Sequence, residues 1–244
     1  MPVQLPGGAG GDAAAVTPVR SLLLLAGALP AFAMAQVGGS VGIASEYWAR
    51  GVPLGDSPAP QLSVNWDGAG GWFAGALLTR AKMRNTGADA AGVFYAGHAR
   101  RLGDGLSAEG GVTAARFHGA GKYGFQEVFA GMALGRAGVR LHYSPHYYGV
   151  YGRSLYAEVN GSIALGENVE LALHAGRLQA REGSAEYYYY APPAQSRTDV
   201  RVGVVGTWSA WTAHLSLLAA RGDRAPYAVQ SRRAALVAGI TRSF

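Results

Sequence analysis

The stretch Val139-Arg140-Leu141-His142-Tyr143-Ser144 alternates strictly between apolar and polar side chains. The stretch Leu155-Tyr156-Ala157-Glu158-Val159-Asn160-Gly161-Ser162-Ile163 follows soon after and alternates in the same manner. Because successive side chains of a β-strand point to opposite sides, each stretch predicts a strand with one apolar and one polar face. Such strands suit two architectures. A soluble sandwich turns the apolar face inward, whereas a membrane barrel turns it towards lipid and encloses the polar face.

The composition favours a turn-rich β protein. Glycine accounts for 37 of the 244 residues, and charged residues make up only 15%, compared with about 25% in typical soluble domains. Glycine is unfavourable in helices and is tolerated in tight turns and strand bends. The absence of cysteine excludes disulfides and thiolate metal sites. The formal charge is +6, but no basic run with interleaved aromatics occurs, so nucleic-acid binding is not supported.

Residues 1–35 have the features of a cleaved secretory signal peptide. Arg20 precedes an apolar run over residues 22–35 that ends in Ala33-Met34-Ala35. A basic region, a short apolar core and a small-x-small site predict cleavage between Ala35 and Gln36. The run of about 14 residues is shorter than the ~20 that a spanning helix needs. We interpret the Gly- and Ala-rich residues 1–17 as an extension from a start codon assigned too early. A peptide of the precursor mapped upstream of Val16 would contradict this.

Alternating segments recur from Gln36 to the C-terminus. Besides the two stretches quoted above, they cover residues 41–47, 61–66, 72–80, 93–101, 106–115, 126–134, 169–176, 199–208, 211–217 and 234–244. The total is about twelve strands, an even number, each near the ~10 residues that a tilted membrane strand requires. The connections alternate in length. Short ones cover residues 67–71, 102–105, 135–138, 166–168 and 209–210, and long ones cover residues 49–60, 83–90, 117–123, 145–153, 179–198 and 220–231.

The alternation of short and long connections distinguishes a membrane barrel from a soluble sandwich. Short periplasmic turns and longer outer loops are typical of outer-membrane barrels, whereas a sandwich gives no reason for every second connection to be short. Trp66, Trp72, Trp208 and Trp211 lie beside short turns, where an aromatic girdle would face the periplasmic interface. We therefore predict an all-β fold for residues 36–244, a transmembrane antiparallel β-barrel of about twelve strands in the outer membrane, with both termini in the periplasm.

Several motifs resemble the TorF family of outer-membrane porins. Residues 41–51 (VGIASEYWARG), 58–61 (PAPQ) and 71–75 (GWFAG) are similar to the opening of that family, and residues 143–149 (YSPHYYG) with 154–156 (SLY) to its central motif. Residues 199–203 (DVRVG) and the terminal Ser243-Phe244 fit its end. The likeness covers roughly residues 40–244. Ala49 replaces a usual aromatic residue, and Pro53-Leu54 replaces a common Ser-Gln pair. The resemblance implies a barrel fold more firmly than it implies a porin activity.

A barrel would enclose the polar faces of the strands. The expected inward-facing set is Glu46, Gln61, Ser63, Asn65, Glu109, Glu127, Arg140, His142, Glu158, Asn160, Glu170, His174, Arg201 and His214. Arg140 lies on a strand between those of Glu127 and Glu158, which makes these three side chains the leading candidates for a pore constriction. The other candidate pore-lining residues are His142, Asn160, Glu109, Glu170 and Arg201. A charged constriction would select solutes, whereas a ladder of ion pairs would be structural because enclosed charges need partners. Both roles are compatible.

The lumen of a twelve-stranded barrel is expected to be narrow. Eight strands leave an interior filled by side chains, and sixteen leave an aqueous channel. Residues 179–198, the longest connection, are a candidate plug.

His142-Tyr143-Ser144 suggests a second chemistry. It resembles the His-x-Ser of outer-membrane phospholipase, in which a histidine activates a serine nucleophile. That motif continues with Asn-Gly, whereas Pro145-His146 follows here. The lipid-facing side would also belong to Leu141 and Tyr143 and not to the pair. We therefore predict no catalytic residues.

The remaining candidates are weaker. The six histidines show no ligand spacing, so no metal and no cofactor are predicted. Tyr187–Tyr190 suits an outer aromatic girdle or loop packing, with stacking on sugars or on a partner as the alternative. Arg221, Arg224, Arg232 and Arg233 lie near the outer rim, where they would either be solvated or meet lipopolysaccharide phosphates.

These observations predict a porin-like channel for passive diffusion of small hydrophilic solutes. Its partners would be outer-membrane lipids and lipopolysaccharide. The alternatives are a non-conducting barrel with a structural or surface-binding role and a phospholipase-like lipid-active enzyme. Conductance separates the first from the others, and phospholipid hydrolysis that depends on Ser144 identifies the last.

Overall fold

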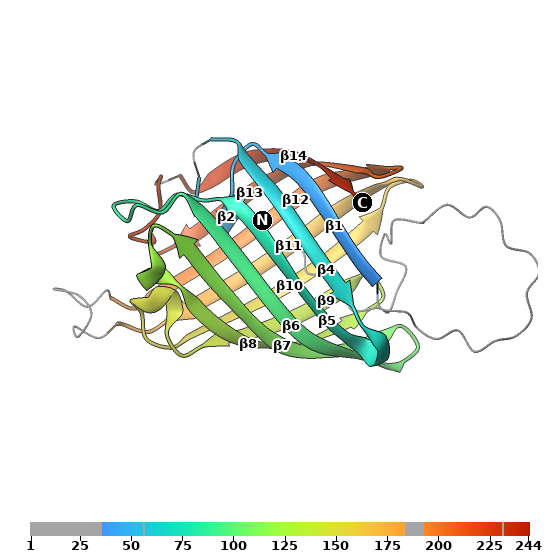
Figure 1. Ribbon diagram of the computed structural model, residues 1–244, viewed down its shortest axis with the longest axis horizontal. Helices are drawn as coiled ribbons and strands as arrows, with labels where there is room; N and C mark the ends of the chain where they lie inside the picture. Colours follow the sequence, from blue (N-terminus) through green and yellow to red (C-terminus); the bar gives the residue numbers. More distant parts are fainter. Residues whose placement is uncertain (1–35, 56, 184–192, 231) are drawn as a thin grey trace, which may run out of the picture.

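The computed structural model describes residues 36–55, 57–183, 193–230 and 232–244. Twelve long strands form one closed barrel (Figure 1), which confirms the predicted fold class. The strands are β1 (Gln36–Ala44), β4 (Ala59–Asp67), β5 (Trp72–Arg80), β6 (Ala90–Gly103), β7 (Leu106–His118), β8 (Phe125–Leu134), β9 (Ala137–Ser144), β10 (Ser154–Ala164), β11 (Val169–Ala180), β12 (Gln195–Trp208), β13 (Trp211–Gly222) and β14 (Ala234–Ser243). The expected signal peptide and Tyr187–Tyr190 lie outside the described residues.

The barrel closes between its first and last strands. β1 pairs antiparallel with β4 on one side and with β14 on the other, where Ile43 lies opposite Ile240. The backbones of Gly39 and Phe244 exchange two hydrogen bonds of 3.1 and 3.0 Å, so the C-terminal residue continues the pairing. Closure leaves no unpaired sheet edge, which the hydrocarbon core would not tolerate.

The two faces of the wall carry opposite chemistry. Outward-pointing aliphatic side chains are exposed along the strands, for example Val128 (54%), Leu141 (46%), Val202 (48%) and Leu217 (57%). Their polar neighbours, such as Glu127 and His142, are buried inside. An apolar outer band around a polar interior is the inverse of a soluble sandwich and is typical of outer-membrane barrels. Within the described residues, no helix is long and apolar enough to cross a membrane.

The connections differ between the two ends of the barrel (Figure 1). One end carries the C-terminus, η1 (Ala69–Gly71) and the short turns, and the other carries the longer loops with η2 (Gly121–Tyr123) and η3 (Tyr147–Gly149). All four expected tryptophans lie at the short-turn end and are at least 40% exposed, and Trp208 pairs directly with Trp211 across a two-residue turn. This is the end that the sequence predicts to face the periplasm.

Glycines let large side chains lie flat against the inner wall. A Cβ on Gly176 of β11 would collide with the hydroxyl of Tyr156, and one on Gly111 would lie 2.7 Å from the ring of Phe129. A Cβ on Gly75 would likewise collide with the hydroxyl of Tyr95. Part of the glycine excess therefore makes room inside the barrel, in addition to its role in turns.

The first long loop differs from its prediction. The segment expected over residues 41–47 ends as a strand at Ala44, and residues 45–55 fold into the barrel with a small hairpin of β2 (Trp48–Ala49) and β3 (Val52–Pro53) (Figure 1). Trp48 packs on Leu218, Ala235 and Val237, which line the inside of β13 and β14. We call residues 45–55 the inward loop.

The inward loop also changes the predicted position of Tyr47. Strict alternation over residues 41–47, with Glu46 facing inward, puts Tyr47 on the lipid-facing side with Val41 and Ile43. That prediction is wrong, because the chain leaves the wall after Ala44 and Tyr47 is only 3% exposed within the outer half of the barrel.

Candidate functional site

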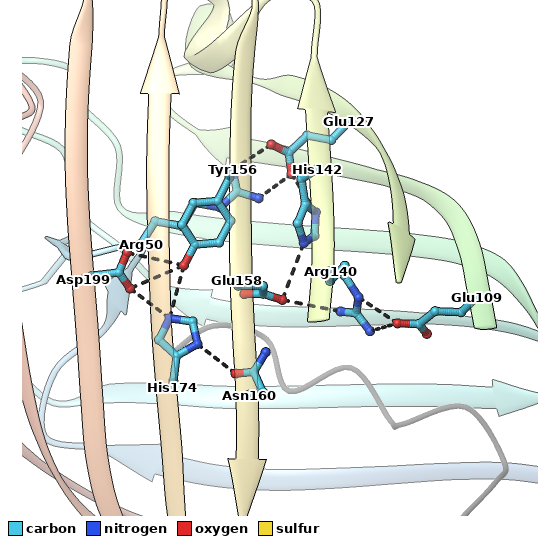
Figure 2. Close-up of polar contacts among 10 residues, drawn as sticks. All are labelled: Arg50, Glu109, Glu127, Arg140, His142, Tyr156, Glu158, Asn160, His174 and Asp199. Atoms are coloured by element: carbon cyan, nitrogen blue, oxygen red, sulfur yellow. Dashed lines mark hydrogen bonds and ion pairs between the residues drawn. The ribbon is translucent and has the colours of Figure 1, made fainter. Parts of the chain in front are cut away.

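Six side chains form a continuous charged cluster across the lumen, which we call the charge network: Arg50, Glu109, Glu127, Arg140, His142 and Glu158. They come from the inward loop and from β7, β8, β9 and β10 (Figure 2). Because neighbouring antiparallel strands place polar side chains side by side on one face, the register alone brings Glu158 opposite Arg140.

Arg50 makes a bidentate ion pair within the network. Its two terminal nitrogens each donate to one oxygen of Glu127 at 2.6 Å, the bidentate geometry that fits a guanidinium to a carboxylate. The Arg50 guanidinium also lies over the ring of Tyr156 at 4.4 Å. Burial disfavours the charged form of Arg50, but Glu127 outweighs this effect and holds the pKa of Arg50 well above its ordinary value.

His142 and Arg140 extend the network along the wall. His142 lies between two carboxylates, with its ring nitrogens 3.5 Å from Glu127 and 3.6 Å from Glu158. Arg140 donates from Nε to Glu109 at 2.8 Å and lies 3.9 Å from Glu158. Arg140 and Glu127, two of the three leading constriction candidates, are therefore linked through His142 and Glu158 and form no ion pair of their own.

A second polar group lies beside the network on β10, β11 and β12. His174 contacts Asp199 at 2.9 Å and Asn160 at 2.8 Å, and the Tyr156 hydroxyl lies 3.1 Å from His174 (Figure 2). Tyr156 stacks under Arg50, so this group and the charge network are in contact.

The other candidate residues lie apart from these groups. Glu170 accepts from Arg136 at 3.3 Å near the periplasmic turns. Arg201 lies opposite His174 in the register, and its Nε is buried without a hydrogen-bond partner among the described residues. The sequence therefore predicted lumen-facing positions for these residues but not which of them meet.

Arg50 is the residue that sequence patterning missed, because it lies in a loop. Its backbone carbonyl accepts a hydrogen bond from Arg197 at 3.5 Å. Gly51 follows with φ of +72°, and a Cβ there would lie within 3.0 Å of Ala220 and Asp199. Glu46, at the start of the loop, pairs with Arg232 at 2.7 Å. Several contacts thus hold the inward loop against the inner wall.

Aromatic side chains pack together within the outer half of the barrel. Tyr148 stacks on Tyr227 with ring centroids 4.1 Å apart and also contacts Phe117 and Phe125. Tyr148 has a φ of +49°, and a Cβ on the following Gly149 would collide with the Lys122 carbonyl. We call this packed group, with Tyr47, Tyr147, Leu54 and Met83, the outer cluster. Its members come from several outer loops. The middle of the candidate plug, residues 184–192, lies outside the described residues.

A cavity remains between the outer cluster and the charge network. Its volume is about 100 Å³, and its lining includes Tyr147, Tyr148, Arg50, Glu127 and His142. It is large enough for a few water molecules.

The phospholipase-like pair is not assembled. His142 and Ser144 both face the lumen on β9, and the nitrogens of His142 face glutamates. Ser144 is fully buried, and its hydroxyl has no hydrogen-bond partner among the described residues. Neither side chain meets lipid, where a lipid-active serine would have to act. Within the described ranges, no group of three or more His, Cys, Asp or Glu residues could hold a metal ion.

Tyr47 provides a test of the packing of the outer cluster. Burial raises the pKa of Tyr47 to about 12, against the opposing effect of Arg50, whereas an unfolded tyrosine titrates near 10. The neutral hydroxyl therefore stabilises the fold below pH 10, and this contribution is lost as the pH rises through 12. We expect wild type to lose about 2–3 kcal/mol more than Tyr47→Phe over that range. Urea unfolding of both proteins between pH 9 and 12 measures this difference. If the free energies of unfolding of the two proteins change with pH in parallel, Tyr47 is not buried.

Comparison with known proteins supports the architecture. The sequence matches no protein-family model and no curated protein. The solved structure of the KdgM porin aligns over 85% of this chain and 99% of its own, with 12% identity and a TM-score of 0.53. The NanC porin aligns over 85% and 99%, with 10% identity and a TM-score of 0.51. The chain has the fold of these porins. Membership of the TorF family stays a prediction.

Proposed function

We propose that this protein is an outer-membrane channel for passive diffusion of small hydrophilic solutes. The observation that carries the proposal is the charge network, which crosses the interior of a closed barrel whose outer face is apolar. Enclosed charges at this density are costly unless they are paired, and in channels they select what passes. The porin fold supports the same function.

The constriction would consist of Arg140, Glu127 and Glu158, with Arg50 added from the inward loop. Glu109 and His142 complete the ring of charges. Asn160 and Arg201 would line the lumen beside it, and Glu170 would lie at its periplasmic mouth. A solute would exchange its hydration shell for hydrogen bonds to these groups, as selectivity filters require.

Passage would require the inward loop to move. Arg50 and the outer cluster fill the outer half of the barrel, and the cavity beneath holds about 100 Å³. We interpret this arrangement as the closed state of a channel whose gate is the inward loop. The same observation favours an alternative, a non-conducting barrel whose outer loops bind a surface partner.

The membrane environment follows from the proposed location. Residues 1–35 would direct export and be cleaved near Ala35, and residues 36–244 would insert in the outer membrane. Lipopolysaccharide phosphates would meet the exposed arginines at the outer rim, Arg221, Arg224 and Arg233. Arg232 is less available because it is paired with Glu46.

Planar-bilayer recording tests the channel and its constriction. The refolded protein is expected to give discrete conductance steps. Arg140→Ala removes the cation that lies 2.8 Å from Glu109 and 3.9 Å from Glu158. The lumen then carries a surplus of carboxylates, so reversal potentials in a salt gradient are expected to shift towards cation selectivity.

The matched control is Arg100→Ala, which removes the same charge from the exposed outward face at the short-turn end of β6. It is expected to leave selectivity unchanged. A correctly folded, heat-modifiable barrel that stays silent, both as wild type and with Arg50 replaced, would support the non-conducting alternative.

A further inference from the structure

A polar patch interrupts the lipid-facing side of the barrel near its outer end. Arg177 of β11, Thr198 of β12 and Arg221 of β13 are direct cross-strand neighbours in one row. Both arginines are exposed, whereas the next row towards the periplasm is apolar, with Ala175, Val200 and Ala219. Two positive charges therefore flank a hydroxyl on the outer surface of the wall.

Arg177 is only partly satisfied by its neighbours. It donates to the hydroxyls of Thr198 at 3.0 Å and Ser196 at 3.1 Å. No carboxylate pairs with it within the described part of the chain. A guanidinium has five N–H donors in a planar fork, so three remain for another acceptor. Asp223 is the nearby acid, and it accepts the backbone N–H of Ser196 at 2.7 Å.

An apolar groove leads away from this patch along the outer wall. It has a volume of about 590 Å³, and its lining runs from Met132 on β8 through Leu141 and Ala157 to Arg177 and Thr198. Ala130, Ala157 and Ala175 form its floor between the larger Val139, Leu141 and Val159. The groove is therefore open towards lipid, apolar along its length and basic at its outer end.

We propose that this surface binds one lipopolysaccharide molecule through its lipid A. A phosphate would accept hydrogen bonds from Arg177 and Thr198 and face the charge of Arg221, and one acyl chain would lie in the groove. Paired N–H donors of arginine fit phosphate oxygens, and such charge-assisted bonds strengthen where water is scarce.

The position of the patch selects this lipid over glycerophospholipids. It lies at the end of the long loops, which is the outer leaflet, whereas phospholipids belong to the periplasmic leaflet. Further exposed arginines surround it on the outer rim, namely Arg153, Arg181, Arg224 and Arg233. Such a surplus suits a lipid with several phosphates. The inference rests on the outer-membrane location in the proposed function, but not on conduction.

Native mass spectrometry of the delipidated full-length protein in detergent tests the site. The probes are bis-phosphorylated lipid A, the same lipid without phosphates, and phosphatidylglycerol. We expect one tightly retained bis-phosphorylated lipid A, and at least about tenfold weaker binding by Arg177→Gln combined with Arg221→Gln. Ala157→Phe fills the groove and is expected to weaken binding with both arginines intact.

Two controls match these variants. Arg100→Gln removes a charge from the outward face at the opposite end of the barrel, and Ala96→Phe adds a ring elsewhere on that face. Both are expected to bind like wild type. Equal retention of phosphatidylglycerol would overturn the proposal, and so would unchanged lipid A binding in all variants. If the wild-type spectrum shows a dimer, and the variants lose this dimer but keep their lipid, the face binds a second copy of the chain and the proposal is also overturned. Conductance does not enter these readouts.

Discussion

Arg50→Ala is expected to release the inward loop and to raise single-channel conductance several-fold. Arg50 ties that loop to β8, with both terminal nitrogens 2.6 Å from Glu127. Alanine at this position leaves no group that can bridge the loop to β8. The inward loop would then exchange between the lumen and the outer surface, and the recording would show larger or more frequent openings.

The same substitution is expected to destabilise the barrel. The Glu127 side chain is only 2% exposed, and without Arg50 its charge would be left with His142 as its remaining close contact. Breaking a buried pair by removal of one partner costs about 3–5 kcal/mol, because the other charge stays buried. Urea unfolding in lipid vesicles measures this loss.

Glu127→Gln separates the two effects of Arg50→Ala. The double variant, Arg50→Ala with Glu127→Gln, removes the unpaired carboxylate and is expected to recover much of the stability while keeping the raised conductance. The coupling free energy from this double-mutant cycle reports the pair itself. An Arg50→Ala protein that conducts like wild type would show that the inward loop is not the gate.

The wall of the barrel is predictable because each strand carries its own pattern. Leu141 and His142 differ in polarity, and their positions alone determine which one meets lipid. The short turns are predictable for the same reason, because each depends only on its own residues. Asp104-Gly105 and Ser209-Ala210 each need one residue with φ > 0, and Gly105 and Ser209 adopt it. The ends of the strands are harder to predict from the sequence pattern. β6 and β11 each extend three or more residues beyond the alternating segment that predicted them.

The contacts of the candidate site depend on long-range packing, which a strand pattern does not contain. Arg50 and Glu127 are 77 residues apart, and nothing in the alternation indicates that a loop turns inward. One signal was present, because the predicted lumen set holds five glutamates and only two arginines. Enclosed charges require partners, so this excess of carboxylates pointed to a cation outside the strands.

The neighbours of Arg140 illustrate the same limit at shorter range. Adjacent strands placed Arg140 between Glu127 and Glu158, but its guanidinium reaches past the next strand to Glu109 on β7. The length of the side chains and the tilt of the strands decide which carboxylate Arg140 reaches. Gly131 of β8 leaves room for the pair to form across that strand, because a Cβ there would lie 3.0 Å from Glu109. Register alone therefore gives the candidates but not the pairs.

Val202→Arg is expected to destabilise the protein by about 2–4 kcal/mol, the cost of a guanidinium at the lipid-facing midplane. Val202 lies in the middle of β12 between Leu173 and Leu217 and is 48% exposed on the outward face. The matched control is Val37→Arg at the periplasmic start of β1, where the 72% exposed side chain lies near the interface and the expected cost is about 0–1 kcal/mol. Urea unfolding in lipid vesicles measures both. Equal losses in the two variants would mean that these faces do not meet a bilayer, because a soluble protein would tolerate arginine at either exposed position.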